Sequence, residues 1–109
     1  MKVIAEFTVI PVGVGVSLSE YVAACERVLA GTGLHYELHA NGTNLEGEWE
    51  QVMDAIKRCH EILHGMGVPR LSTIVIIGTR VDRDQDMDEK VASVKAKLQD
   101  VENNRLPPA

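Results

Sequence analysis

The sequence predicts an α+β sandwich in which two helices cover one face of a four-stranded antiparallel sheet, with an extra helix at the C-terminal end. Strand patterns, rich in β-branched residues and alternating in polarity, occur in four segments, and helical periodicity occurs in three. Their order along the chain is β-α-β-β-α-β plus a final helix. This split βαβ order is typical of the ferredoxin-like fold, for which we expect the spatial strand order 4-1-3-2.

A first strand is predicted over Val3 to Val12, because β-branched and aromatic residues occupy it and apolar residues lie on both of its faces. Apolar residues on both faces indicate a central strand. A helix is expected next, since apolar residues recur at helical spacing from Leu18 to Leu29. Its start fits a capping box, because Ser17 and Glu20 have the S-x-x-E spacing in which each side chain bonds the other residue's free backbone donor.

A tight hairpin is predicted at Asn41-Gly42, a pair typical of type I′ turns, in which both central residues have positive φ. The strand before the turn alternates in polarity from Leu34 to His39. After the turn, Thr43 to Glu46 are expected to pair back, and Gly47 is expected to end the strand.

The second helix is expected to begin at Glu48-Trp49 and to end at Gly65 and Gly67. Its apolar stripe consists of Val52, Ala55, Ile56, Cys59, Leu63 and Met66. The last strand is predicted over Leu71 to Val81, which contains the unbroken apolar run Ile74-Val75-Ile76-Ile77.

The third helix is predicted to follow an acidic connector. Its heptad-like stripe, suited to packing on a neighbouring subunit or on its own domain, consists of Met87, Val91, Val94, Leu98 and Val101. We expect residues 1–102 to form a single domain and residues 103–109, which contain two prolines, to form a flexible tail.

Composition excludes several classes of partner. The 109 residues carry a net charge of −5 and only 4% aromatic residues, which argues against nucleic acid or an anionic membrane as the main partner. The first residues, MKVIAEFTV, lack the features of a signal peptide, and we expect a cytoplasmic protein. Cys25 and Cys59 lie on the apolar stripes of two predicted helices, and we expect both to be buried free thiols.

Two patterns suggest metal binding. His60-Glu61-Ile62-Leu63-His64 spells the H-E-x-x-H signature of zinc hydrolases. The third histidine of the longer signature is missing, since Arg70 stands there, and Glu61 faces away from the helix edge where His60 and His64 lie. We favour solvated histidines over catalytic or structural metal.

The second metal pattern is on a strand. His35, Glu37 and His39 share one face of it, which suits either a metal or, more often, a polar sheet edge or a subunit contact. We therefore expect no metal site.

The face of the sheet that the helices leave open is expected to be apolar. The first and last strands have apolar residues on both faces, so a monomer would expose a large apolar patch. We predict a homo-oligomer, a dimer or a tetramer, that associates at least in part through sheet faces.

Three segments resemble a known family: V-I-P-V-G at the end of the first strand, S-x-S-E-Y-V at the start of the first helix, and Y-E-L-x-x-x-G-T-x-x-E-G-E-W-E-x-V-M around the hairpin. Together they resemble the small thiamine-binding protein family, which is related to the tandem-domain YkoF-like proteins. The resemblance runs from about Val3 to Leu98. It implies a ferredoxin-like fold, dimers or tetramers, and binding of thiamine or its hydroxymethylpyrimidine half without catalysis.

The residues around the hairpin suit such a ligand, because an aminopyrimidine needs a hydrogen-bond acceptor, a donor and an apolar plate. The candidate ligand-binding residues are Thr43, Asn44, Glu46, Trp49, Ser17 and Ser19. Structural roles stay open: Thr43 could only complete the hairpin, and Trp49 could be a core or interface anchor. We expect no cofactor and no catalytic residue. The alternative functions are an oligomeric regulatory or scaffold module with another small ligand, and a zinc-dependent hydrolase through His60, Glu61 and His64.

Overall fold

The structure, a computed structural model, describes the backbone of residues 1–103 and the side chains of residues 1–100. Contacts divide the chain into two compact units, Met1–Thr79 and Arg80–Ala109. The first unit holds the sheet and two helices, and the second holds one helix. None of the helices in the described part of the chain is long and apolar enough to cross a membrane.

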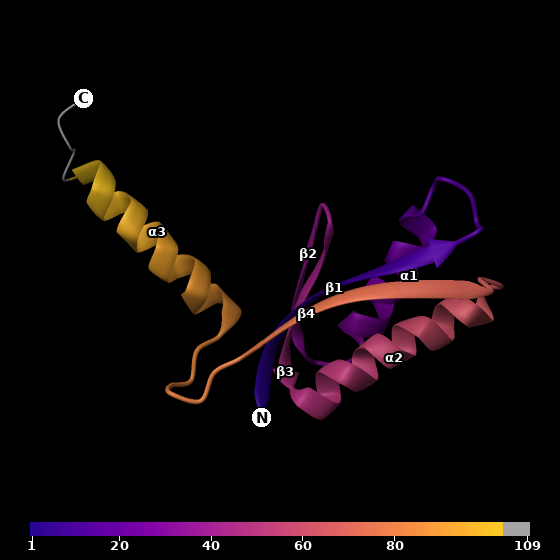
Figure 1. Ribbon diagram of the computed structural model, residues 1–109, viewed down its shortest axis with the longest axis horizontal. Helices are drawn as coiled ribbons and strands as arrows, with labels where there is room; N and C mark the ends of the chain where they lie inside the picture. Colours follow the sequence, from indigo (N-terminus) through magenta and orange to yellow (C-terminus); the bar gives the residue numbers. More distant parts are fainter. Residues whose placement is uncertain (104–109) are drawn as a thin grey trace. The chain divides into compact units, whose positions relative to one another are not determined.

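The first unit has the predicted ferredoxin-like architecture. Its elements are β1 (Lys2–Val12), α1 (Ser19–Ala30), β2 (His35–His39), β3 (Gly42–Glu48), α2 (Trp49–Gly65) and β4 (Arg70–Thr79) (Figure 1). The strands form one antiparallel sheet in the order β2-β3-β1-β4, which is the predicted order 4-1-3-2 read from the other edge. The fold prediction is confirmed.

The register of the sheet decides which side chains meet the helices. Ala5 of β1 lies opposite Leu45 of β3 on one side and Ile77 of β4 on the other. These three residues share the face that α1 and α2 cover, and successive residues of each strand point to the opposite face. The core lies between that face and the helices, and its fully buried side chains include Val3, Leu29, Leu45, Val52, Cys59 and Leu63.

The hairpin between β2 and β3 differs from the predicted type I′ turn. His39 pairs with Gly42, so Ala40 and Asn41 are the central residues of the turn. Neither has positive φ, since glycines alone have positive φ in the described chain. Gly42 is needed for a different reason: a Cβ atom there would lie 2.7 Å from Thr8 Oγ1 and 3.0 Å from the Phe7 carbonyl oxygen. Glycine therefore lets β3 begin directly against β1.

Gly47 does not end β3, contrary to the prediction. It pairs with Val3, and the strand continues to Glu48. A Cβ atom on Gly47 would lie 2.9 Å from Leu34 Cδ2. The missing side chain thus makes room for Leu34 rather than breaking the strand.

The predicted capping box at the start of α1 is also wrong. The helix begins at Ser19 and its N-cap is Leu18, which provides no side-chain cap. The Leu18 carbonyl accepts hydrogen bonds from the backbone N–H groups of Tyr21 and Val22. Because the helix begins later than predicted, Ser17 lies outside it and Glu20 is one residue too close to the N-cap for the reciprocal bond.

The second unit contains α3, which runs from Met87 to Asn103. Asp86 stabilises its start, because its Oδ1 accepts a hydrogen bond of 2.8 Å from the backbone N–H of Glu89. Three residues of the predicted stripe are more than half exposed: Val91, Val94 and Leu98. The side chain of Val101 and most of the predicted flexible tail, residues 104–109, lie outside the described residues.

Candidate functional site

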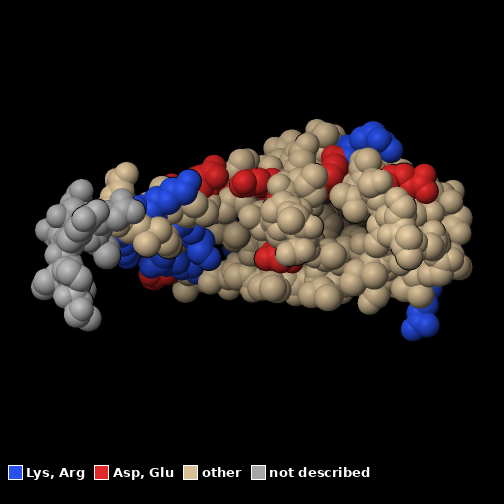
Figure 2. All heavy atoms as spheres, turned by 90° about the horizontal axis from the view of Figure 1, so that it is seen from above, with Lys and Arg blue, Asp and Glu red and all other residues tan. Residues whose placement is uncertain are grey.

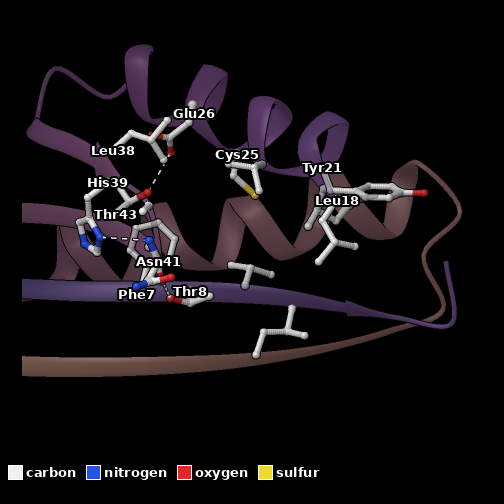
Figure 3. A pocket seen from close by; sticks show the side chains of 16 residues that line it. Phe7, Thr8, Leu18, Tyr21, Cys25, Glu26, Leu38, His39, Asn41 and Thr43 are labelled. Carbon is white, nitrogen blue, oxygen red and sulfur yellow. Dashed lines mark hydrogen bonds between the residues drawn. The ribbon is translucent and has the colours of Figure 1, made fainter. Parts of the chain in front are cut away.

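The first unit contains a cavity of about 370 Å³ between α1, β1 and the turn of the β2–β3 hairpin (Figure 3). Most of its wall is apolar. The apolar side chains that line it include Phe7, Val9, Leu18, Tyr21, Val22 and Leu63. Such a wall accepts a flat ring and leaves the choice of ligand to the few polar groups at its ends.

The principal polar pair in the cavity is Glu26 of α1 with Thr43 of β3. Thr43 lies opposite Phe7, whose side chain is in the core, so the threonine also points toward the helices. Its side chain is 5% exposed, and its hydroxyl donates a hydrogen bond of 3.2 Å to Glu26 Oε2 (Figure 3). The pair therefore joins helix and sheet at one end of the cavity.

Half of the Glu26 carboxylate has no partner. Its Oε1 atom is out of contact with solvent and makes no hydrogen bond. Burial raises the pKa of Glu26, and the hydrogen bond from Thr43 opposes that shift. A buried acceptor without a donor is destabilising, and a ligand that donates to Oε1 would remove this cost.

The turn of the hairpin is fastened at the mouth of the cavity. Thr8 Oγ1 donates a hydrogen bond of 2.7 Å to the Asn41 carbonyl oxygen, which ties the turn to β1. The backbone N–H of Asn41 lies 3.4 Å from Nδ1 of His39. Asn41 and His39 also line the cavity, so their side chains add donor and acceptor groups at its edge.

The two cysteines lie beside this cavity as buried free thiols, which confirms the prediction. Cys25 lines the cavity, and Cys59 Sγ lies 3.9 Å from the Cys25 carbonyl oxygen. The neighbouring Cys25 side chain, together with burial, raises the pKa of Cys59. A thiol held protonated in this way is a packing group rather than a nucleophile.

The predicted ligand-binding residues are divided between two faces of the sheet. Thr43 faces the helices and lines the cavity. Asn44 and Glu46 lie opposite Glu6 and Ile4, on the face that α1 and α2 do not cover. The structure therefore does not bring Glu46 and Thr43 together, although three positions separate them in the sequence.

The remaining predicted residues lie outside the cavity wall. Trp49 is the first residue of α2, and its side chain is 38% exposed. Ser17 and Ser19 are exposed at the approach to α1. Ligand roles for these three residues, and for Asn44 and Glu46, stay predictions.

Sequence reasoning missed Glu26. The residue follows Cys25 at the edge of the apolar stripe of α1, where a charged side chain is usually solvated. One signal was present: Glu26 is four residues after Val22 and three before Leu29, which places it on the side of the helix that meets the sheet. Its partner Thr43 could not be identified without the tertiary structure.

The H-E-x-x-H histidines have hydrogen-bond partners within the first unit. His60 Nε2 lies 2.5 Å from Thr73 Oγ1, and His64 Nδ1 lies 2.7 Å from the Val68 carbonyl oxygen. Glu61 is exposed. Among the described residues, no three His, Cys, Asp or Glu side chains form a group that could hold a metal ion, and this includes the histidines of β2.

Comparison with protein families gives a match over most of the chain. Residues 5–95 match the model of a family described as thiamine-binding protein. A UPF0045 protein of Synechocystis sp. is 52% identical over 99 residues, which cover 91% of this chain and 82% of the relative. A UPF0045 protein of Methanothermobacter thermautotrophicus is 42% identical, over 86% of this chain and 97% of the relative.

Solved structures share the fold. A hypothetical protein of Methanocaldococcus jannaschii superimposes with a TM-score of 0.80 at 32% identity, over 86% of this chain and 96% of its own. A proposed thiamine biosynthesis/salvage protein of Thermotoga maritima gives a TM-score of 0.74 at 24% identity, over 86% of this chain and 99% of its own.

Proposed function

Because the chain belongs to the thiamine-binding protein family, we propose that it is a cytoplasmic, non-catalytic protein that binds thiamine or its hydroxymethylpyrimidine half in the cavity between α1 and the hairpin. The observation that carries the proposal is the Glu26 carboxylate, which has one unpartnered oxygen at the edge of an apolar cavity. A ligand with both an apolar ring and a hydrogen-bond donor matches this combination.

The chemistry of the ligand fits the groups at the cavity. An aminopyrimidine ring offers two flat apolar faces, an amine that donates, and ring nitrogens that accept. Phe7 and Leu18 provide apolar surface, and Asn41 provides a donor for a ring nitrogen. A charged Glu26 would also offset the positive charge of the thiazolium ring in whole thiamine.

Calorimetric titration tests the proposal, with thiamine and hydroxymethylpyrimidine as the ligands. Val22→Trp fills the cavity from α1, because Val22 is part of its lining and is 38% exposed, so the larger side chain can be placed without unfolding the helix. Ala23→Trp is the matched control, since Ala23 is exposed on the same helix and does not line the cavity.

We expect wild type and Ala23→Trp to bind at least one of the two ligands, and Val22→Trp to lose that binding while keeping its circular dichroism spectrum. Heat from neither ligand in folded wild-type protein would contradict the proposed ligand class. Equal affinity of Val22→Trp and Ala23→Trp would contradict the proposed place of binding.

We also propose self-association through the face of the sheet opposite α1 and α2. Ile74 and Ile76 lie opposite Thr8 and Glu6 on that face and are 59% and 62% exposed. Figure 2 shows charged side chains scattered among the other residues on one face of the protein. Exposed isoleucines on the uncovered face of a sheet are typical of an interface between subunits.

Light scattering after gel filtration tests this association. Ile76→Asp introduces a charge on the open face, and Ile62→Asp, at an exposed isoleucine of α2, is the matched control. We expect Ile76→Asp to dissociate an oligomer that wild type and Ile62→Asp form. A monomeric wild-type protein at micromolar concentration would contradict the association.

A further inference from the structure

The cavity has an acid at one end and no permanently charged base among its wall residues. Glu26 is the only carboxylate among the described residues that line it, and that set contains no lysine or arginine. Thr43 satisfies one carboxylate oxygen, and the other has no donor. None of the wall residues donates to Oε1, so a ligand with a positive charge or an N–H group can provide the missing donor.

We propose that Glu26 determines specificity at this site: it selects heteroaromatic ligands that carry an amino group, and it releases its proton when such a ligand binds. This inference rests on the proposed function and goes beyond it, because it names the selecting residue and a proton that accompanies binding. The proton leaves the carboxyl group for the solvent, and no bond of the ligand changes.

Burial favours the neutral form of Glu26, because desolvation raises the pKa of its carboxyl group. An amine that donates to Oε1, next to the hydroxyl of Thr43 on Oε2, gives both oxygens a donor and stabilises the carboxylate. An analogue with oxygen in place of that amine presents an acceptor to the ionised carboxylate, which is also an acceptor, and this contact is unfavourable.

Leu38 lies beside Glu26 at the hairpin end of the cavity (Figure 3). It pairs with Thr43 across the hairpin, lines the same cavity, and is 54% exposed. Because its side chain is exposed, Leu38 can change rotamer without movement of the backbone. The ligand can thus reach the carboxylate from the side of the hairpin.

Other titratable groups near Glu26 are few. Tyr21 and Cys25 of α1 and His39 of β2 line the cavity, and Cys59 of α2 lies behind Cys25. Burial raises the pKa of Tyr21, and the neighbouring Cys25 side chain raises that of Cys59, so both stay neutral between about pH 5 and 8. A variant at Glu26 separates its titration from that of His39 and of the ligand.

The test is calorimetric titration from about pH 5 to 8 with thiamine and with oxythiamine, in which oxygen replaces the ring amine, in buffers of different ionisation enthalpy. The proteins are the full chain, Glu26→Gln and Glu26→Asp. Glu20→Gln is the matched control, because Glu20 is exposed on the same helix and does not line the cavity.

We expect wild type and Glu20→Gln to bind thiamine more tightly as pH rises, to release protons at low pH, and to prefer thiamine to oxythiamine by about tenfold or more. Glu26→Gln should lose this preference. It should also release fewer protons on binding than wild type, because Glu26 no longer contributes one. Glu26→Asp should retain proton release with weaker binding, because it keeps an ionisable group on a shorter side chain.

Two results would overturn the inference and leave the proposed function standing. One is thiamine binding by wild type with the same preference and proton release as Glu26→Gln. The other is equal affinity of wild type for thiamine and oxythiamine. If wild type binds neither thiamine nor hydroxymethylpyrimidine at any pH, the proposed function fails, and that result is distinct from the first two.

Discussion

The two faces of the sheet contain similar residue types in different settings. On the face that α1 and α2 cover, Thr43 and the helix residue Glu26 form a polar pair at the edge of an apolar cavity. On the opposite face, Asn44 and Glu46 of β3 are the cross-strand partners of Glu6 and Ile4 of β1. Neighbours in the sequence therefore lie on opposite faces of the sheet, because successive side chains of a strand point to opposite faces.

The comparison shows why a sequence block is not the same as a site. The segment from Tyr36 to Met53 marks the family, and its polar residues are close together along the chain. The fold separates them, and it adds Glu26 from a helix that is 17 residues away from Thr43. Variants on the two faces can test which face holds the ligand.

The largest expected difference between the faces is in stability. Leu45→Ala removes a side chain that is 0% exposed from the core, and we expect a loss of about 2–5 kcal/mol in the free energy of unfolding. Ile76→Ala removes a side chain that is 62% exposed, and we expect an effect within about 0.5 kcal/mol at low protein concentration.

Denaturant unfolding at two protein concentrations measures both changes. The Leu45→Ala effect should not depend on concentration, whereas the Ile76→Ala effect should grow as the protein associates. A large, concentration-independent loss for Ile76→Ala would mean that the open face is part of the core of a monomer.

The next largest effect is on ligand affinity. We expect Glu26→Gln to weaken thiamine binding by about 1.5–3 kcal/mol, because it removes a charged acceptor from the site. Glu46→Gln, on the opposite face, should change affinity by no more than about 0.5 kcal/mol. Calorimetry on the two variants side by side decides between the faces, and the reverse order of effects would place the ligand beside Glu46.

A third prediction separates binding from folding. Thr43→Val leaves both oxygens of Glu26 without a donor, and we expect a loss of about 1–3 kcal/mol in stability. The double variant Glu26→Met/Thr43→Val replaces both partners with apolar groups and should recover that loss while abolishing ligand binding. Thermal unfolding measures the first effect. A double variant less stable than Thr43→Val would show that the polar pair serves the fold.

The smallest effect is the pH dependence of stability. The pKa of Glu26 is raised in the folded state above its ordinary value of 4.5, so the folded protein favours the protonated form. Its contribution to stability is present below pH 4.5 and is lost as pH rises through the folded pKa. Relative to Glu26→Gln, wild-type protein should become less stable across that interval in denaturant titrations, and parallel curves for the two proteins would be inconsistent with a buried acid.

The fold could be predicted from the sequence because periodicity and element order agree. The central strand, both covering helices and the strand order all follow from apolar spacing. The details at the turns could not be predicted so well. Gly42 and Gly47 were interpreted through backbone conformation, whereas both make room for neighbouring atoms, which the sequence does not show.

The site was predictable only in part. Thr43 was predicted because it lies in a polar block after a hairpin, and the structure places it in the wall of the cavity. Glu26 was missed because one acid at the edge of an apolar stripe has the same sequence pattern whether it is solvated or buried. Its special property, an oxygen without a donor, depends on the packing of α1 against the hairpin.

The most direct test of the central claim is a crystal structure of the protein grown with thiamine. The account predicts ring-shaped density in the cavity between α1 and the hairpin, with the ring amine within hydrogen-bonding distance of Glu26 Oε1. Density on the opposite face of the sheet, beside Asn44 and Glu46 and with the cavity unchanged, would contradict it.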